Sequence, residues 1–101
     1  MKTGTLDIKK VEKVAFIQKA IGNPLRIGII DALRVNDELT VNEISRHMKA
    51  EQSLVSHNLL NMKLKGILES RRDGKNIFYR LRLKEVLKVI QCMEHCSLDD
   101  F

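Results

Sequence analysis

The fold is decided by residues 39–62, which read LTVNEISRHMKAEQSLVSHNLLNM. Thr40 and Glu43 have the spacing of a capping box, in which each side chain bonds the other's backbone N–H at the start of a helix. A turn near residues 49–51 separates this short helix from a second one over about residues 52–65. The second helix has a core-facing stripe at the i, i+4, i+7 spacing, made of Val55, Leu59 and Met62. The segment therefore predicts two helices joined by a tight turn.

After Gly66 the pattern of apolar residues changes from the spacing of a helix to that of strands. Residues 67–72 and 75–81 are predicted to form two strands, because the Asp73-Gly74 pair between them is a strong signal for a two-residue hairpin. The hairpin carries several basic side chains near its tip. A helix pair followed by a basic hairpin is the layout of a winged helix-turn-helix.

Three further helices are predicted around this centre. Apolar residues recur at three- and four-residue intervals over residues 6–21 and indicate an amphipathic first helix. Gly, Asn and Pro at residues 22–24 end it and start the next, which runs to about residue 35. A last helix is predicted over about residues 83–96. We expect one domain over residues 1–101 that is mainly α with a two-stranded β-hairpin wing, in the order α-α-α-α-β-β-α.

Composition favours a soluble globular protein of the cytoplasm. The 101 residues are 44% hydrophobic and 31% charged, typical of folded soluble domains. There is no apolar run of the length a membrane span needs, and residues 1–10 do not form the apolar segment of a signal peptide. Two cysteines do not make a secreted disulfide framework. We expect no membrane association.

Positive charge is concentrated in the middle of the chain. Ten Lys or Arg residues and three Asp or Glu residues lie between Arg46 and Lys84, a balance of +7, whereas the whole chain carries +5. A basic block inside a folded domain favours a polyanionic partner.

The helix pair and the hairpin supply candidate DNA contacts, because a helix fits the major groove and cations fit the backbone or minor groove. The predicted base-contacting residues on the second helix are Gln52, Ser53, Leu54, Ser56, His57 and Asn58. The predicted wing contacts are Arg71, Arg72, Lys75 and Asn76. Each pattern alone is also typical of a solvated surface or a protected edge strand. Together they predict binding to duplex DNA.

The sequence resembles the ArsR/SmtB family of bacterial repressors over nearly its whole length. The resemblance is carried by Gly22-Asn23-Pro24-Leu25-Arg26, Glu38-Leu39-Thr40-Val41-Asn42-Glu43-Ile44, Gln52-Ser53-Leu54-Val55-Ser56, Gly66-Ile67-Leu68-Glu69-Ser70-Arg71-Arg72-Asp73-Gly74-Lys75 and Tyr79-Arg80-Leu81. This chain departs from the family at Asn58, where His is usual, and at Leu60, where a polar residue is usual.

The resemblance implies a homodimer formed by the first and last helices, an inverted-repeat operator that overlaps a promoter, and release by an inducer. The residues expected at the dimer interface are Leu6, Val11, Val14, Val86, Ile90 and Met93. Two familiar metal sites of the family are incomplete in this chain. Thr40 and Asn42 stand where one site has Cys, and Leu83, which cannot ligate, stands in a second set with Glu85, Cys96 and Asp99.

A separate cluster near the C-terminus leaves three interpretations open. Cys92, His95 and Cys96 lie at i, i+3 and i+4 and would share one face of a helix. They could bind Zn(II) or Cu(I), with further ligands from a partner helix. The cysteines could instead form a disulfide between subunits, or serve as small apolar fillers at the end of a dimerisation helix, with His95 exposed.

No enzyme motif stands out, since a Gly-rich phosphate loop, a Ser-His-Asp set and an H-x-x-x-H arrangement are all missing from the sequence. We therefore predict a non-enzymatic, sequence-specific DNA-binding regulator, a repressor released by an inducer. The competing interpretation is a winged-helix module for protein association or dimerisation, with only non-specific affinity for DNA.

Overall fold

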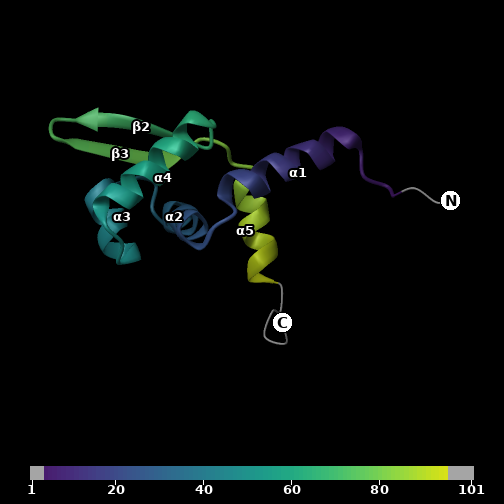
Figure 1. The fold of residues 1–101 in the computed structure, drawn as a ribbon, viewed down its shortest axis with the longest axis horizontal. Helices are drawn as coiled ribbons and strands as arrows, with labels where there is room; N and C mark the ends of the chain where they lie inside the picture. Colours follow the sequence, from purple (N-terminus) through teal and green to yellow (C-terminus); the bar gives the residue numbers. More distant parts are fainter. Residues whose placement is uncertain (1–3, 96–101) are drawn as a thin grey trace.

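The computed structural model describes residues 4–95 and contains every helix and strand expected within them (Figure 1). The elements are α1 (Ile8–Ile21), α2 (Pro24–Val35), β1 (Leu39–Thr40), α3 (Val41–Met48), α4 (Gln52–Leu64), β2 (Leu68–Asp73), β3 (Asn76–Leu81) and α5 (Val86–Glu94). The fold is mainly helical with a small antiparallel sheet. No helix within the described residues is both long enough and apolar enough to cross a bilayer.

The sheet has a third strand that the sequence did not predict. β1 pairs with β3, with Leu39 opposite Tyr79 and Thr40 opposite Phe78, so the strand order is β1-β3-β2. A two-residue strand is too short to show alternation, and its pairing comes from contact with a distant segment. Thr40 therefore ends β1 and also caps α3.

The hairpin turn is shifted by one residue from the predicted position. Asp73 pairs with Asn76, so the two central residues of the turn are Gly74 and Lys75 rather than Asp73 and Gly74. Gly74 has a φ of +63°, and a glycine at the first central position is characteristic of a type II′ hairpin. The β2–β3 hairpin itself is confirmed.

The predicted helix caps are present. The Asn23 side chain accepts a hydrogen bond from the Arg26 backbone N–H at 2.9 Å. At the start of α3, Glu43 N donates to Thr40 Oγ1 at 3.2 Å and Thr40 N donates to Glu43 Oε1 at 2.9 Å. The bond from the Thr40 backbone N–H lowers the pKa of the Glu43 carboxyl, because it stabilises the charged form. Local sequence thus fixes where α2 and α3 begin.

The core lies between α2, α3, α4, α5 and the sheet. Its fully buried side chains include Ile29, Ile30, Ile44, Leu59, Ile67 and Val86. Two residues expected at a dimer interface belong to this core, since Val86 is 0% exposed and Ile90 is 4% exposed. The prediction for these two residues is wrong, because the apolar side of α5 packs against the rest of its own chain. The side chain of Met93 lies outside the described residues.

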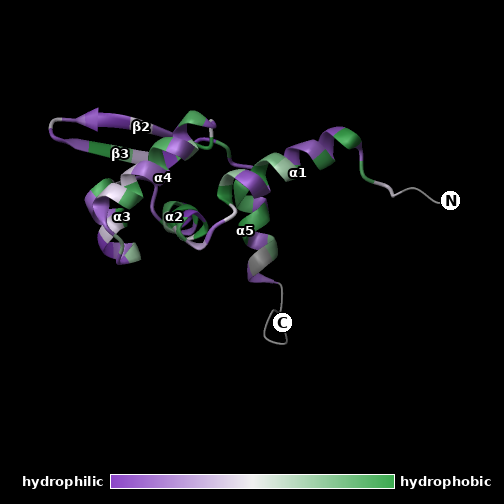
Figure 2. Ribbon diagram, in the orientation of Figure 1, coloured by the Kyte–Doolittle hydropathy of each residue, from purple (hydrophilic) through white to green (hydrophobic). Residues whose placement is uncertain are grey.

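α1 has a different environment. Only its last turns are buried, at Ile17, Ala20 and Ile21, and its N-terminal half extends away from the body of the molecule (Figure 1). Hydrophobic residues continue along this projecting part (Figure 2). Leu6, Ile8, Val11, Val14 and Phe16 are all exposed. The predicted interface residues Leu6, Val11 and Val14 are therefore accessible to another chain.

Candidate nucleic-acid interface

α4 presents one exposed face of mainly short, polar side chains. Five of the six residues predicted to contact bases are exposed on this helix: Gln52, Ser53, Leu54, Ser56 and His57. Its opposite side is anchored by Val55, Leu59 and Met62, each 0% exposed. Burial of that stripe fixes which side of α4 faces solvent, because a helix cannot turn without exposing it. The exposed face is thus held by the core.

Asn58, the sixth predicted residue, does not face solvent. It is 6% exposed, and both groups of its side-chain amide are used inside the molecule. Oδ1 accepts a hydrogen bond from Arg26 Nε at 2.7 Å, and Nδ2 donates to the Leu54 carbonyl at 2.9 Å. The prediction that Asn58 contacts DNA is wrong, because its position on α4 belongs to the buried side.

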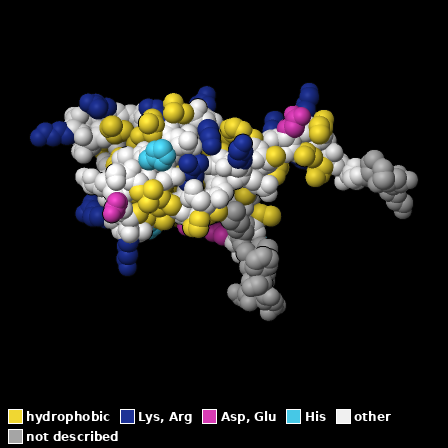
Figure 3. Space-filling model, in the orientation of Figure 1, with side chains coloured by type: hydrophobic (Ala, Val, Ile, Leu, Met, Phe, Trp, Pro, Cys, Tyr) yellow, Lys and Arg dark blue, Asp and Glu magenta, His cyan; other side chains and the backbone are white. Residues whose placement is uncertain are grey.

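The tip of the β2–β3 hairpin is a projecting basic element. Arg72, Lys75 and Asn76 are exposed there, and Lys and Arg side chains mark the outer end of the hairpin in the space-filling view (Figure 3). Among the described residues, neither Arg72 nor Lys75 is within ion-pair distance of a carboxylate. Their charge is available to an external anion.

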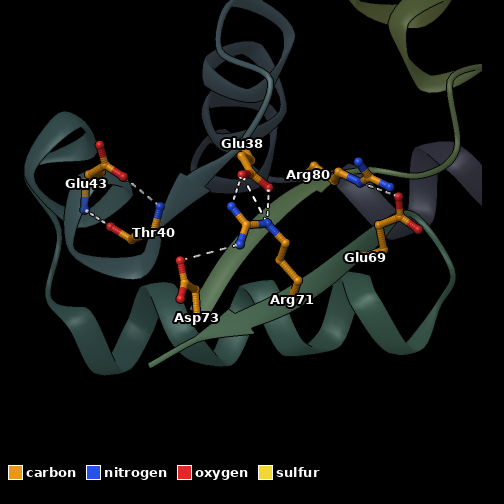
Figure 4. A network of polar contacts seen from close by, with 7 residues as sticks. All are labelled: Glu38, Thr40, Glu43, Glu69, Arg71, Asp73 and Arg80. Atoms are coloured by element: carbon orange, nitrogen blue, oxygen red, sulfur yellow. Dashed lines mark hydrogen bonds and ion pairs between the residues drawn. The ribbon is translucent and has the colours of Figure 1, made fainter. Parts of the chain in front are cut away.

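Unlike Arg72, Arg71 is paired with a carboxylate of its own chain (Figure 4). Its Nε donates to Glu38 Oε1 at 3.1 Å and to Oε2 at 3.0 Å, and its guanidinium lies 4.4 Å from the centre of the Phe78 ring. The hydrogen bond from Arg71 lowers the pKa of the Glu38 carboxyl. Arg71 therefore ties the hairpin to the segment before β1, and much of its charge is balanced there.

A second ion pair lies on the same face of the hairpin. Arg80 on β3 bonds Glu69 on β2 (Figure 4), and the two residues are directly opposite in the strand register. Exposed pairs of this kind contribute little to stability, typically about 0–1 kcal/mol. Their effect on the interface is to leave the positive charge of the hairpin mainly at its tip.

The C-terminal cluster is only partly described. Cys92 and His95 are exposed and line a shallow hollow with Lys88, Gln91 and Glu94, while Cys96 lies outside the described residues. Within residues 4–95 there is no group of three or more side chains that could hold a metal ion. Metal binding and thiol oxidation at this cluster stay predictions. The third interpretation, small apolar fillers at the end of a dimerisation helix, also stays a prediction.

Comparisons with known proteins agree with this arrangement. The family model described as bacterial regulatory protein, arsR family, matches residues 23–70. An uncharacterized HTH-type transcriptional regulator of Methanocaldococcus jannaschii is 36% identical over 86 residues, which cover 82% of this chain and 97% of the relative.

Two solved structures are similar over most of the chain. The crystal structure of the transcriptional repressor BigR from Xylella fastidiosa has a TM-score of 0.80 at 27% identity and covers 89% of this chain and 93% of its own. The solution structure of a homodimeric winged helix-turn-helix DNA-binding domain from Mycobacterium bovis has a TM-score of 0.69 at 26% identity. That alignment covers 93% of this chain and 86% of the other.

Proposed function

Since this chain belongs to the ArsR family of winged-helix transcriptional regulators, we propose that it acts as a repressor that places α4 in the major groove of an inverted-repeat operator. The observation that carries this proposal is the exposed polar face of α4 opposite a fully buried stripe. A helix presented in this way fits the major groove, where base edges display a distinct pattern of donors and acceptors.

The exposed side chains of α4 supply the chemistry of base recognition. Gln52 can make a paired hydrogen bond to adenine, and the hydroxyls of Ser53 and Ser56 can bond any of several base edges. Leu54 is 50% exposed and can contact the methyl group of thymine. We assign His57 to the same surface. These residues occupy the first half of α4, the part of a recognition helix that enters the groove.

The hairpin tip supplies contacts that do not depend on sequence. Arg72 and Lys75 would neutralise phosphates beside the major-groove site, and Asn76 would bond the backbone or minor groove. Phosphate contacts fix the register of a protein on DNA and give binding its salt dependence. Arg71 would act on the position of the hairpin through Glu38 rather than on DNA.

An inverted repeat requires two copies of the chain, and α1 supports a homodimer. A helix of 14 residues is marginal on its own in water, and the N-terminal half of α1 exposes a row of large apolar side chains. Such a surface marks a protein interface. The homodimeric Mycobacterium bovis relative supports the same assembly. We propose that α1 and the outward side of α5 form this dimer, with residues 1–101 acting as one domain in the cytoplasm.

Selection of DNA from a random-sequence library by the full chain tests the proposed function. We expect an enriched inverted repeat, with half-sites about one helical turn apart from centre to centre, or a multiple of that distance. The competing interpretation, a winged-helix module for protein association, predicts that no sequence is enriched. That result would contradict the proposed regulatory role but not the description of the fold.

A further inference from the structure

Arg26 joins three segments of the molecule at one guanidinium group. Its Nη1 donates a hydrogen bond to the Ala20 carbonyl in the last turn of α1, at 2.9 Å. Its Nε donates to Asn58 Oδ1 on α4, at 2.7 Å. Its own backbone lies in the first turn of α2, where Asn23 caps it. A single side chain on α2 therefore contacts both the apolar α1 and the DNA-facing α4.

The Ala20 carbonyl needs this partner because α1 ends at Ile21 and the chain is extended at Asn23, before residue 24. In a continuing helix, the carbonyl of residue 20 would accept a hydrogen bond from the backbone N–H of residue 24. Residue 24 is also a proline, which has no N–H. Ala20 is 1% exposed, and buried carbonyls are nearly always paired. The guanidinium of Arg26 completes the end of α1.

Asn58 links the hydrogen bonds of Arg26 to the backbone of α4. Because a guanidinium only donates, the Asn58 amide must direct its oxygen toward Arg26 and its NH₂ group elsewhere. That NH₂ group donates to the Leu54 carbonyl, in the part of α4 whose exposed side chains we assign to base contacts. A continuous set of hydrogen bonds thus runs from the end of α1 through Arg26 and Asn58 to the first half of α4.

We propose that Arg26 and Asn58 are positioning residues that set the orientation of α4 relative to α1, and so the half-site spacing that the dimer accepts. The inference rests on the proposed function, in which α1 joins the two copies and α4 contacts bases. The planar fork of an arginine fixes two acceptors in one geometry, so α4 cannot shift against α1 without losing a charge-assisted hydrogen bond.

Arg34 provides a matched control on the same helix. It also bonds two partners, Asp31 at 2.8 Å and Glu94 at 2.7 Å. The Asp31 contact lies within α2 and the Glu94 contact joins α2 to α5, and neither involves α1 or α4. Loss of Arg34 therefore removes an arginine with a comparable number of contacts without touching the proposed set of hydrogen bonds.

The test uses the full chain and two duplexes. One duplex is the sequence that the wild-type chain selects from a random library, and the other has one base pair inserted between its half-sites. We expect the wild-type chain to prefer the first duplex by about tenfold, a difference of ~1.4 kcal/mol. Arg26→Met and Asn58→Leu should each reduce the preference to about threefold or less, and the double variant should match the single ones, because linked residues are not additive. Arg34→Met should keep the tenfold preference.

Folding is monitored separately by circular dichroism and by the mass of the complex in solution. Asn58→Asp keeps an acceptor for Arg26 but loses the donor to the Leu54 carbonyl. It should therefore keep part of the spacing preference that Asn58→Leu loses, which a defect of packing alone does not predict. If Arg26→Met and Asn58→Leu weaken binding to both duplexes equally, their role is only structural and the proposal is overturned. If the wild-type chain selects no sequence, the proposed function fails first and the positioning role fails with it.

Discussion

α4 and α1 both expose a long face to solvent, and the two faces have opposite chemistry. The exposed side of α4 carries mainly polar groups and is held from behind by a buried stripe. The exposed side of α1 carries large apolar groups on a part of the helix that projects from the body. A fixed polar face suits a polar, ordered partner such as a base-pair edge. A projecting apolar face is stable only when another apolar surface covers it.

The largest expected effect concerns the apolar face. Val11→Glu combined with Val14→Glu would place two unpaired carboxylates from each chain in the proposed interface, where burying an unpaired charge costs several kcal/mol. We expect the dimer dissociation constant to rise by about a thousandfold or more, equivalent to ~4 kcal/mol, measured by sedimentation equilibrium. Lys13→Glu, also on an exposed part of α1, is the control and should change it little. A double variant that stays dimeric would mean that another surface joins the copies.

The next effect concerns the polar face. Ser56→Ala should cost about 1–3 kcal/mol of binding to the selected duplex and relax the preference at one base position. Ser56→Thr keeps the hydroxyl and should retain most of the affinity. Competition titrations against duplexes with single base changes measure both results. Equal weakening on every duplex would show that Ser56 does not contact a base.

The hairpin offers a smaller contrast between adjacent arginines. Arg72→Ala should weaken binding to all duplexes alike and reduce the slope of log K against log salt by about 1, because one phosphate contact is lost. Arg71 is bonded to Glu38, so Arg71→Ala should change the salt slope less than Arg72→Ala does. Titrations of both variants with one duplex at several salt concentrations measure the two slopes. The reverse order would assign the phosphate contact to Arg71.

The smallest effect is a pH dependence of stability. The pKa values of Glu38 and Glu43 are lowered in the folded chain by their hydrogen bonds to Arg71 and to the Thr40 backbone. The unfolded chain therefore binds more protons as pH falls below ~5, and the contribution of both carboxylates to stability is lost in that range. We expect Tm to fall less between pH ~5 and ~3 in Glu43→Gln than in the wild-type chain. An unchanged pH profile would mean that the Glu43 bond contributes nothing measurable.

Local chemistry explains which parts of the fold were predictable. Asn23, Pro24, Thr40 and Glu43 act on their own helix ends, so sequence spacing alone placed α2 and α3. β1 and the bond between Glu38 and Arg71 depend on contacts between distant segments. No local pattern encodes either of them.

The prediction for Asn58 could have been improved from the sequence. Residues 55, 58, 59 and 62 have the i, i+3, i+4, i+7 spacing of one helical face, which places Asn58 with Val55, Leu59 and Met62 on the buried side. Asn58 was nevertheless predicted to contact DNA, because its side chain is polar. Its partner Arg26, 32 residues earlier in the chain, could not be inferred without the fold.

The most direct test of the account compares the affinity of the full chain for the selected duplex with its affinity for a random duplex of equal length in the same salt. A regulator that reads bases with α4 predicts a preference of about a thousandfold or more for the selected duplex, typical of specific against non-specific binding. Equal affinity for both duplexes would contradict the claim that the exposed face of α4 recognises sequence.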